Sequence, residues 1–320
     1  MKHSGIGNLF SHRLQYRMIY VVNFAFLCVI IVYLSFYLML WRVTKVVEKP
    51  DQFCREYKPS IVHKNLLYIQ SMNILYCNVP KAASSNLRRV LHAHLFPNSR
   101  QNPDRSQVWR NFEKDFRKFY LDNNVESQSI INNRTTNIFK FLLVRHPFRR
   151  IYSAYNDKFV HEHLDNALFG WQATEEGILL QMYPNETVLS LRRRDARLDF
   201  RTFLLFLVDS VKRKRSMDNH WDQIVSRCSV CHIDYDWVGK VENLKEDGPI
   251  LLKQFKGMTK YGIEFPSWKL DEPEHNKTDL NDKQIVELFR MTLNSQDDFR
   301  MLVDYYKPDF QAFKYALPHY

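Results

Sequence analysis

The sequence lacks several features that define common protein classes. It has no internal repeat, which excludes a repeat architecture, and no low-complexity tract. The GxxxxGK[ST] pattern is absent, which excludes a Walker-type phosphate loop, and no recognised nucleic-acid-binding module occurs. Acidic residues are also few, with 35 Asp and Glu against 46 Lys and Arg, giving a formal net charge of +11. A field of this sign favours anionic partners.

Charged residues are missing altogether from residues 18–41, "MIYVVNFAFLCVIIVYLSFYLMLW". As a helix this segment extends about 36 Å, enough to cross a bilayer with some tilt. A cleaved signal peptide has a shorter apolar run and an A-x-A-like site, and a buried soluble helix is rarely apolar all round. We therefore expect a transmembrane anchor. Basic residues flank it almost equally, so the positive-inside rule leaves its orientation open.

Glycosylation triplets and cysteines indicate that orientation. The triplets begin at Asn133, Asn185 and Asn276, all after the apolar segment. Outside it lie four cysteines, Cys54, Cys77, Cys228 and Cys231. An even number predicts two disulfides in an oxidising compartment, with three possible connectivities. "CSVCH" at 228–232 also resembles a haem attachment site or half a zinc site, but the chain has no second C-x-x-C pair.

These features predict a type II membrane protein whose C-terminal part is lumenal. The expected parts are a cytosolic tail at 1–17, the anchor at 18–41, a stem at 42–70 and a lumenal domain at 71–320. Pro50 and Pro59 interrupt any long helix in the stem.

Two buried-strand patterns organise the domain. "NILYCNV" and "IFKFLLV" (138–144) each lead through a turn into a helix, and Pro147 suits the first position of the second helix. Two strand-turn-helix units predict an α/β fold with a parallel sheet, followed by a helix-rich C-terminal part that includes "FRTFLLFLVDSVKR" and "FRMLVDYYKPDFQAF". Ligands of such folds collect at the carboxyl ends of the strands.

Both turns carry groups that bind anions. In "VPKAASSNL", Lys81 precedes a helix N-terminus, and the residues beside it are small enough for an anion to approach the backbone. The expected ligands there are Pro80, Lys81, Ala82, Ala83, Ser84, Ser85 and Asn86. After the second strand, Arg145 and Ser153 suit one phosphate. Two anion sites facing one crevice imply a ligand with two separated phosphate-type groups, although the first segment alone also fits a plain turn with a solvated lysine.

These two segments resemble the 5′-phosphosulfate and 3′-phosphate binding segments of the Golgi carbohydrate sulfotransferases, a family that includes chondroitin, dermatan and N-acetylgalactosamine 4-O-sulfotransferases and a glucuronyl 3-O-sulfotransferase. "HWDQIVSRCSVCHIDYDWVGKVENL" and "YYKPDFQAFKYALP" resemble its HWxP…CxPCxxxYDxIGKxExL and C-terminal Y-x-x-D-F-x-x-F-x-Y motifs. The motifs occur in order over residues 74–317. The family often has Cys-Thr where this chain has Ser84-Ser85, an acidic residue in place of His146, and Glu in place of Arg149. It often has Pro where this chain has Gln223 and Val230.

The resemblance implies a sulfotransferase-type fold, and 3′-phosphoadenosine 5′-phosphosulfate as donor without a metal. Lys81, Ser85 and nearby N–H groups are expected at the 5′-phosphosulfate, and Arg145 with Ser153 at the 3′-phosphate. His220 is the candidate base, because an imidazole accepts protons near neutral pH. Its rivals are Asp157, His161, Glu162 and His163, and a packed core role is the alternative for His220.

The resemblance further implies a Golgi membrane enzyme that sulfates the 4-hydroxyl of N-acetylgalactosamine in chondroitin. Arg192 and Arg193, in "RRRDAR", with "KRKR" at 212–215, are candidate contacts for an acidic chain, and ordinary solvated surface is the alternative. Dermatan, a glycoprotein glycan and a glucuronyl 3-hydroxyl remain alternative acceptors. A catalytically idle lumenal glycan-binding protein is the alternative from another class, whereas a nucleic-acid partner is not expected.

Overall fold

In a computed structural model of the protein, the described residues are 27–34, Cys54, Tyr57, 64–96, 114–122, 125–132, 138–160, 171–255 and 280–320. Residues 1–46 and 47–320 form separate compact units. Within the first unit, residues 27–34 are helical with exposed side chains. No helix in the described parts of the chain is both long and apolar enough to cross a membrane. The remainder of the expected anchor and the tail before it lie outside the described residues.

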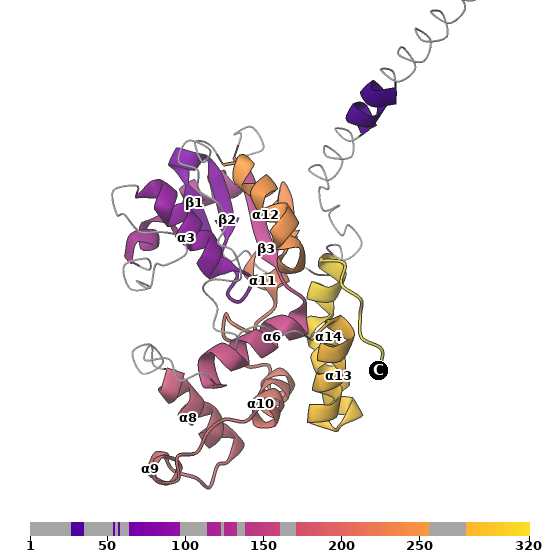
Figure 1. Cartoon of the computed structure of the whole chain (residues 1–320). Coiled ribbons are helices and arrows are strands. Elements are labelled where there is room, and N and C mark those ends of the chain that lie inside the picture. Colours follow the sequence, from indigo (N-terminus) through magenta and orange to yellow (C-terminus); the bar gives the residue numbers. More distant parts are fainter. Residues whose placement is uncertain are drawn as a thin grey trace, which may run out of the picture. The chain divides into compact units, whose positions relative to one another are not determined.

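A four-stranded sheet lies in the second unit (Figure 1). Its strands, in spatial and chain order, are β1 (Leu66–Ile69), β2 (Ile74–Cys77), β3 (Phe139–Val144) and β4 (Trp237–Lys240). β2, β3 and β4 are parallel, as expected, but β1 pairs antiparallel with β2, so the sheet is mixed rather than wholly parallel. The cause is the short link η1 (Gln70–Met72). A parallel pairing needs a crossover of a dozen or more residues.

The two strand-turn-helix units are confirmed. β2 leads into α3 (Ser84–Leu95), and β3 leads into α6 (Pro147–Tyr155), with Pro147 at the helix start. All of β2 and nearly all of β3 are buried, as is usual where helices cover a parallel sheet. Because β2, β3 and β4 run in one direction, the turn before α3, the turn before α6 and the end of β4 share one sheet edge.

Helices make up most of the remaining structure. They are η3 (Arg117–Phe119), α5 (Val125–Asn132), the π-helical η4 (Asn156–Val160), α8 (Trp171–Met182), α9 (Val188–Arg193), α10 (Phe200–Lys212), α11 (Ile224–Arg227), η5 (Val241–Asn243), α12 (Leu244–Lys253), α13 (Asp282–Leu293) and α14 (Gln296–Ala312). α10 and α14 coincide with the two expected helical patterns. Asp199 and Ser295 cap them, each accepting a first-turn backbone N–H.

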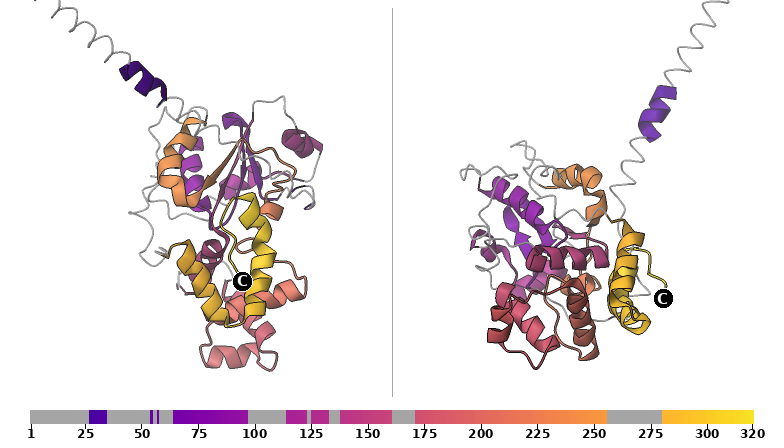
Figure 2. Two further views of the ribbon diagram at one scale, coloured as in Figure 1. Left: turned by 90° about the vertical axis from the view of Figure 1, so that its right-hand side faces the viewer. Right: turned by 60° about the horizontal axis from the view of Figure 1, so that its bottom comes forward.

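Two hydrophobic cores lie on either side of the sheet edge that bears the turns. The first joins the sheet to α3, α11 and α12, and the second fills the space between α6, α8, α10, α13 and α14. α13 and α14 contact each other, and the left view of Figure 2 shows them side by side. α6 starts at the end of β3 and contributes Phe148 and Ile151 to the second core. The region around the two turns is thus held from both sides.

Both predicted disulfides form. Cys54 pairs with Cys231, and Cys77 pairs with Cys228, with Cα atoms 5.4 and 5.7 Å apart. These pairings select one of the three connectivities and exclude the haem or zinc interpretation of "CSVCH". Cys54 lies in the expected stem, and Tyr57 beside it contacts Gln223 and Ser226 through its hydroxyl, both at 2.8 Å. Part of the stem is therefore attached to the segment around α11.

Candidate active site

The turn after β2 has an unusual backbone. Ala82 N–H donates to the Val79 carbonyl at 3.2 Å, with Pro80 and Lys81 between them. Lys81 and Ala83 have φ angles of 66° and 57°, in the left-handed region that non-glycine residues seldom adopt. Each such residue costs about 1 to 3 kcal/mol and persists where the surrounding fold enforces it, often at functional sites. The fold therefore imposes a specific shape on this turn.

That shape leaves backbone donors available at the start of α3. Ala83 occupies the N-cap position but has no side chain that can accept a hydrogen bond. Within the described part of the chain, no acceptor pairs with the N–H groups of Ser84, Ser85 and Asn86. Ala82 is fully buried, and Ser85 at the start of the helix is partly exposed. Unpaired donors and the positive end of a helix dipole fit an anionic oxygen cluster, which is what the sequence predicts here.

Arg145 connects this turn to the one after β3. Its Nη1 donates to the Lys81 carbonyl oxygen at 3.3 Å, which brings the two expected anion-binding residues together. Ser153 is buried in α6. Glu242 fixes the start of α6, because its carboxylate accepts the His146 N–H at 3.0 Å and the Tyr315 hydroxyl at 2.9 Å. The sequence-based interpretation missed Glu242, although it lies in the "GKVENL" motif.

A carboxylate joins two lysines beside these turns. Asp157 Oδ2 lies 3.3 Å from Lys81 Nζ and 2.8 Å from Lys158 Nζ. Burial alone would raise the pKa of Asp157, but the two lysines outweigh it and lower the pKa to about 2. For Lys81, burial lowers the pKa. Asp157 opposes this shift, and the positive charges of Lys158 and Arg145 add to it. The ionised Asp157 therefore helps to keep Lys81 charged.

His220 lies next to this charged group. Its ring centroid is 4.9 Å from that of Trp171, and Lys158 Nζ lies 4.7 Å from the Trp171 ring. Its Nδ1 is 2.6 Å from Asp218 Oδ1. Burial lowers the pKa of His220 below 6.5, and Lys158 and Lys81 lower it further, whereas Asp218 opposes the shift. A lowered pKa favours the neutral imidazole, and a general base must be unprotonated to accept the proton of a substrate hydroxyl.

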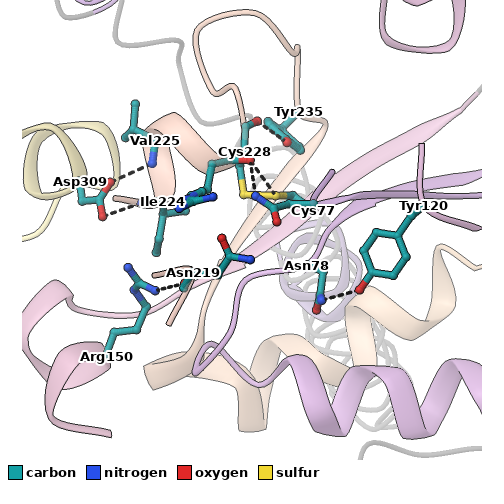
Figure 3. Close-up of a disulfide and its surroundings, with 12 residues drawn as sticks. Cys77, Asn78, Tyr120, Arg150, Asn219, Ile224, Val225, Cys228, Tyr235 and Asp309 are labelled. Carbon is teal, nitrogen blue, oxygen red and sulfur yellow. Dashed lines mark hydrogen bonds between the residues drawn. A yellow bond between two sulfur atoms is a disulfide. The ribbon is translucent and has the colours of Figure 1, made fainter. Parts of the chain in front are cut away.

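Arg150 supports the loop that carries His220. Its side chain is 1% exposed and donates to the carbonyl oxygens of Asn219 at 3.3 Å, His220 at 3.0 Å, and Asp222. Figure 3 shows Arg150 directed at Asn219 near the Cys77–Cys228 disulfide. A buried arginine with three carbonyl acceptors fixes those backbone positions. The sequence-based interpretation missed this residue, because "RR" at 149–150 does not distinguish the buried arginine from its neighbour.

The rivals of His220 are placed differently. Asp157 is committed to two lysines, and a carboxylate with a pKa near 2 is a weak base. His161, Glu162 and His163 lie outside the described residues, as do the sequon residues Asn133 and Asn276. Asn185 is exposed, as a glycan acceptor must be.

The basic runs are largely paired with acidic side chains. Arg192, at the end of α9, forms two hydrogen bonds to Glu176 on α8, at 2.7 and 3.0 Å. Lys212 pairs with Asp298 at 2.9 Å, and Arg213 with Asp209 at 2.7 Å. Arg193 is exposed. Figure 1 shows α9 at the end of the helical part that is remote from the sheet.

The chain belongs to the sulfotransferase family, whose family model matches residues 64–316. Carbohydrate sulfotransferase 11 of Mus musculus is 31% identical over 258 residues, which cover 80% of this chain and 68% of that protein. Carbohydrate sulfotransferase 8 of Homo sapiens is 30% identical over 260 residues, covering 80% and 57%. Carbohydrate sulfotransferase 9 of Homo sapiens is 28% identical over 295 residues, covering 87% and 62%. No solved structure matches significantly. The family resemblance of the motifs is confirmed.

Proposed function

We propose that this protein transfers a sulfuryl group from 3′-phosphoadenosine 5′-phosphosulfate to a hydroxyl group of a glycan. One observation carries the proposal: Arg145 bonds to the Lys81 carbonyl, so two basic turns meet at the carboxyl edge of the parallel strands. A donor with phosphate groups at two separated positions matches such a pair of turns. Membership of the sulfotransferase family, with carbohydrate sulfotransferases among the relatives, supports the same donor and a carbohydrate acceptor.

The residues of the first turn suit the 5′ end of the donor. The N–H groups of Ser84 to Asn86 and the Ser85 hydroxyl would hold the phosphosulfate, and Lys81 would neutralise charge that develops on the leaving phosphate oxygen. Arg145 and Ser153 would hold the 3′-phosphate. The bound donor supplies a sulfuryl group that passes in line between two oxygens, so positioning and charge neutralisation dominate the chemistry.

His220 is the proposed base at the acceptor side. Its unprotonated nitrogen takes the proton of the acceptor hydroxyl as that oxygen bonds to sulfur, while the phosphate oxygen leaves with the electron pair of the broken bond. Lys81 lies close enough to His220 for its charge to lower the pKa of the imidazole. The two groups therefore suit opposite ends of one transfer.

We propose chondroitin as the acceptor, at the 4-hydroxyl of N-acetylgalactosamine. The motif resemblance to chondroitin 4-O-sulfotransferases and the net charge of +11 support this choice. Dermatan, a glycoprotein glycan and a glucuronyl 3-hydroxyl are the alternatives, with an inactive glycan-binding protein outside the enzyme class. Arg192 and Arg193 stay proposed contacts for the acidic chain.

We further propose a Golgi type II membrane protein, anchored by residues 18–41. The uncharged segment, the exposed sequon residue Asn185 and two disulfides support a lumenal domain. In intact microsomes the domain should resist added protease. Its digestion there would contradict this orientation.

The function is tested by incubating the full-length protein with labelled donor and desulfated chondroitin, dermatan, heparosan and neutral glycans. The label should enter desulfated chondroitin, and mapping should place it on the 4-hydroxyl of N-acetylgalactosamine. Label in another glycan would keep the sulfotransferase and replace the acceptor. Binding of chains with no transfer from the donor would favour the glycan-binding alternative.

A further inference from the structure

His220 and Asp218 form a pair with defined geometry. A single carboxylate oxygen, Asp218 Oδ1, lies 2.6 Å from His220 Nδ1 and accepts the His220 backbone N–H at 2.9 Å. The carboxylate thus fixes both the ring and the backbone of the histidine. Since an ionised carboxylate only accepts hydrogen bonds, Nδ1 carries the proton in this contact. The lone pair of the neutral ring then lies on Nε2.

The surroundings hold the pair in place. Arg150, from α6, donates to the His220 carbonyl at 3.0 Å, and Trp171, from α8, packs edge to face against the imidazole. The charged side chains that act on the ring are Asp218 from its own loop, Lys158 from η4 and Lys81 from the turn before α3. Within the described residues, no hydrogen bond engages Nε2. The histidine side chain is 24% exposed, and within the described residues Nε2 is not a buried atom.

We propose that Asp218 is a positioning residue of the active site, which holds the His220 imidazole with Nε2 as the proton acceptor for the glycan hydroxyl. The inference rests on the proposed function. In the reaction, the hydroxyl proton passes to Nε2 as the new oxygen–sulfur bond forms. The imidazolium then keeps its Nδ1 proton and donates it in a hydrogen bond to Asp218, whose negative charge stabilises the positive ring.

The expected loss of kcat on replacing Asp218 follows from the exposure of its side chain. A buried triad aspartate contributes about 10⁴-fold to catalysis, but Asp218 is 43% exposed and water weakens its charge. We expect Asp218→Asn to lower kcat by about 10-fold, a fraction of the roughly 10²- to 10⁴-fold that general base catalysis supplies. Asp297→Asn, an exposed aspartate in the first turn of α14, is the matched control and should keep full activity.

A double-mutant cycle separates positioning from a general structural effect. In the His220→Ala background there is no imidazole to orient, so Asp218→Asn should cause no further loss of kcat. A purely structural role would give the same fold-loss in both backgrounds. The full-length protein, its donor and the acceptor identified by the glycan panel serve for all variants.

Two further readouts do not depend on the size of kcat. Because Asp218 raises the pKa of His220 against the larger effect of burial, Asp218→Asn should move the acid limb of the pH profile to lower pH. Nitrogen NMR of the wild-type imidazole should show a proton on Nδ1, and the variant a mixture of both tautomers.

An unchanged acid limb, an unchanged tautomer, or equal losses in both backgrounds would overturn the inference. A wild-type protein that transfers no sulfuryl group to any glycan would instead overturn the proposed function. The NMR measurement would still decide whether Asp218 orients His220.

Discussion

Lys81 and Lys158 share one carboxylate, which makes a matched pair of substitutions possible. Each lysine contacts Asp157 Oδ2, at 3.3 and 2.8 Å, and their side chains are 18% and 19% exposed. Only Lys81 lies in the turn before α3, where the leaving phosphate is proposed to bind. Replacing either lysine by alanine removes one charge of similar burial, so the two variants differ mainly in the position of the lost charge.

The structure sets the expected magnitudes. In Lys81→Ala, Asp157 keeps Lys158 as its partner, so no uncompensated buried charge remains and the free energy of unfolding should change little. Loss of a transition-state donor lowers kcat by about 10²- to 10³-fold. We expect that loss for Lys81→Ala and less than about 10-fold for Lys158→Ala, which lies outside the anion-binding turn.

The assay is the rate of sulfuryl transfer at saturating donor and acceptor, with urea unfolding of both variants as the stability control. A kcat within about threefold of wild type for Lys81→Ala would remove Lys81 from the mechanism. Equal losses in the two variants would show that local charge matters more than the position in the turn. Either result would refute the role assigned to the turn.

Three other perturbations give distinct expectations. Replacing both Cys77 and Cys228 by serine should lower the free energy of unfolding by about 2 to 5 kcal/mol, because it removes their disulfide. Unchanged urea unfolding would show that this disulfide does not stabilise the fold. Folding lowers the pKa of Asp157 from 3.8 to about 2, so its contribution to stability is complete above about pH 4 and is lost as the pH falls towards 2. Wild-type stability should therefore fall more steeply than that of Asp157→Asn between pH 4 and pH 2, and parallel curves would count against the ion pairs. Acceptor KM should rise with ionic strength. Arg193→Ala should flatten this rise more than Arg192→Ala, because the charge of Arg192 is already paired with a glutamate on α8. An identical salt dependence in the wild type and both variants would exclude both arginines as contacts.

Local patterns predicted the elements that depend on local chemistry. The buried strands β2 and β3 were identified from apolar runs, and the start of α6 from Pro147, whose fixed φ suits the first helical turn. The approach of Lys81 and Arg145 followed from the rule that parallel strands end at one edge. The antiparallel direction of β1 was not predicted, because a four-residue apolar strand carries no signal for its direction.

The contacts around the proposed base required the fold. Asp157 and Lys158 lie in η4, whose π-helical turn departs from the 3.6-residue period on which helical predictions rest. Asp218 meets His220 within a loop, where no periodicity applies. The sequence also leaves open which residues neutralise the basic runs, because Lys212 pairs with Asp298 from a helix remote in the chain.

The direct test of the central claim is a binding measurement with two nucleotides that differ by one phosphate. Adenosine 3′,5′-bisphosphate and adenosine 5′-monophosphate are titrated into wild-type protein and Arg145→Ala by calorimetry. Hydrogen bonds to a charged phosphate contribute about 1.5 to 3 kcal/mol, so the bisphosphate should bind wild type about 10- to 100-fold more tightly. Arg145→Ala should lose most of this preference and keep only the part that the Ser153 hydroxyl contributes. Equal affinities in the wild type, or an undiminished preference in Arg145→Ala, would contradict the proposed two-phosphate site.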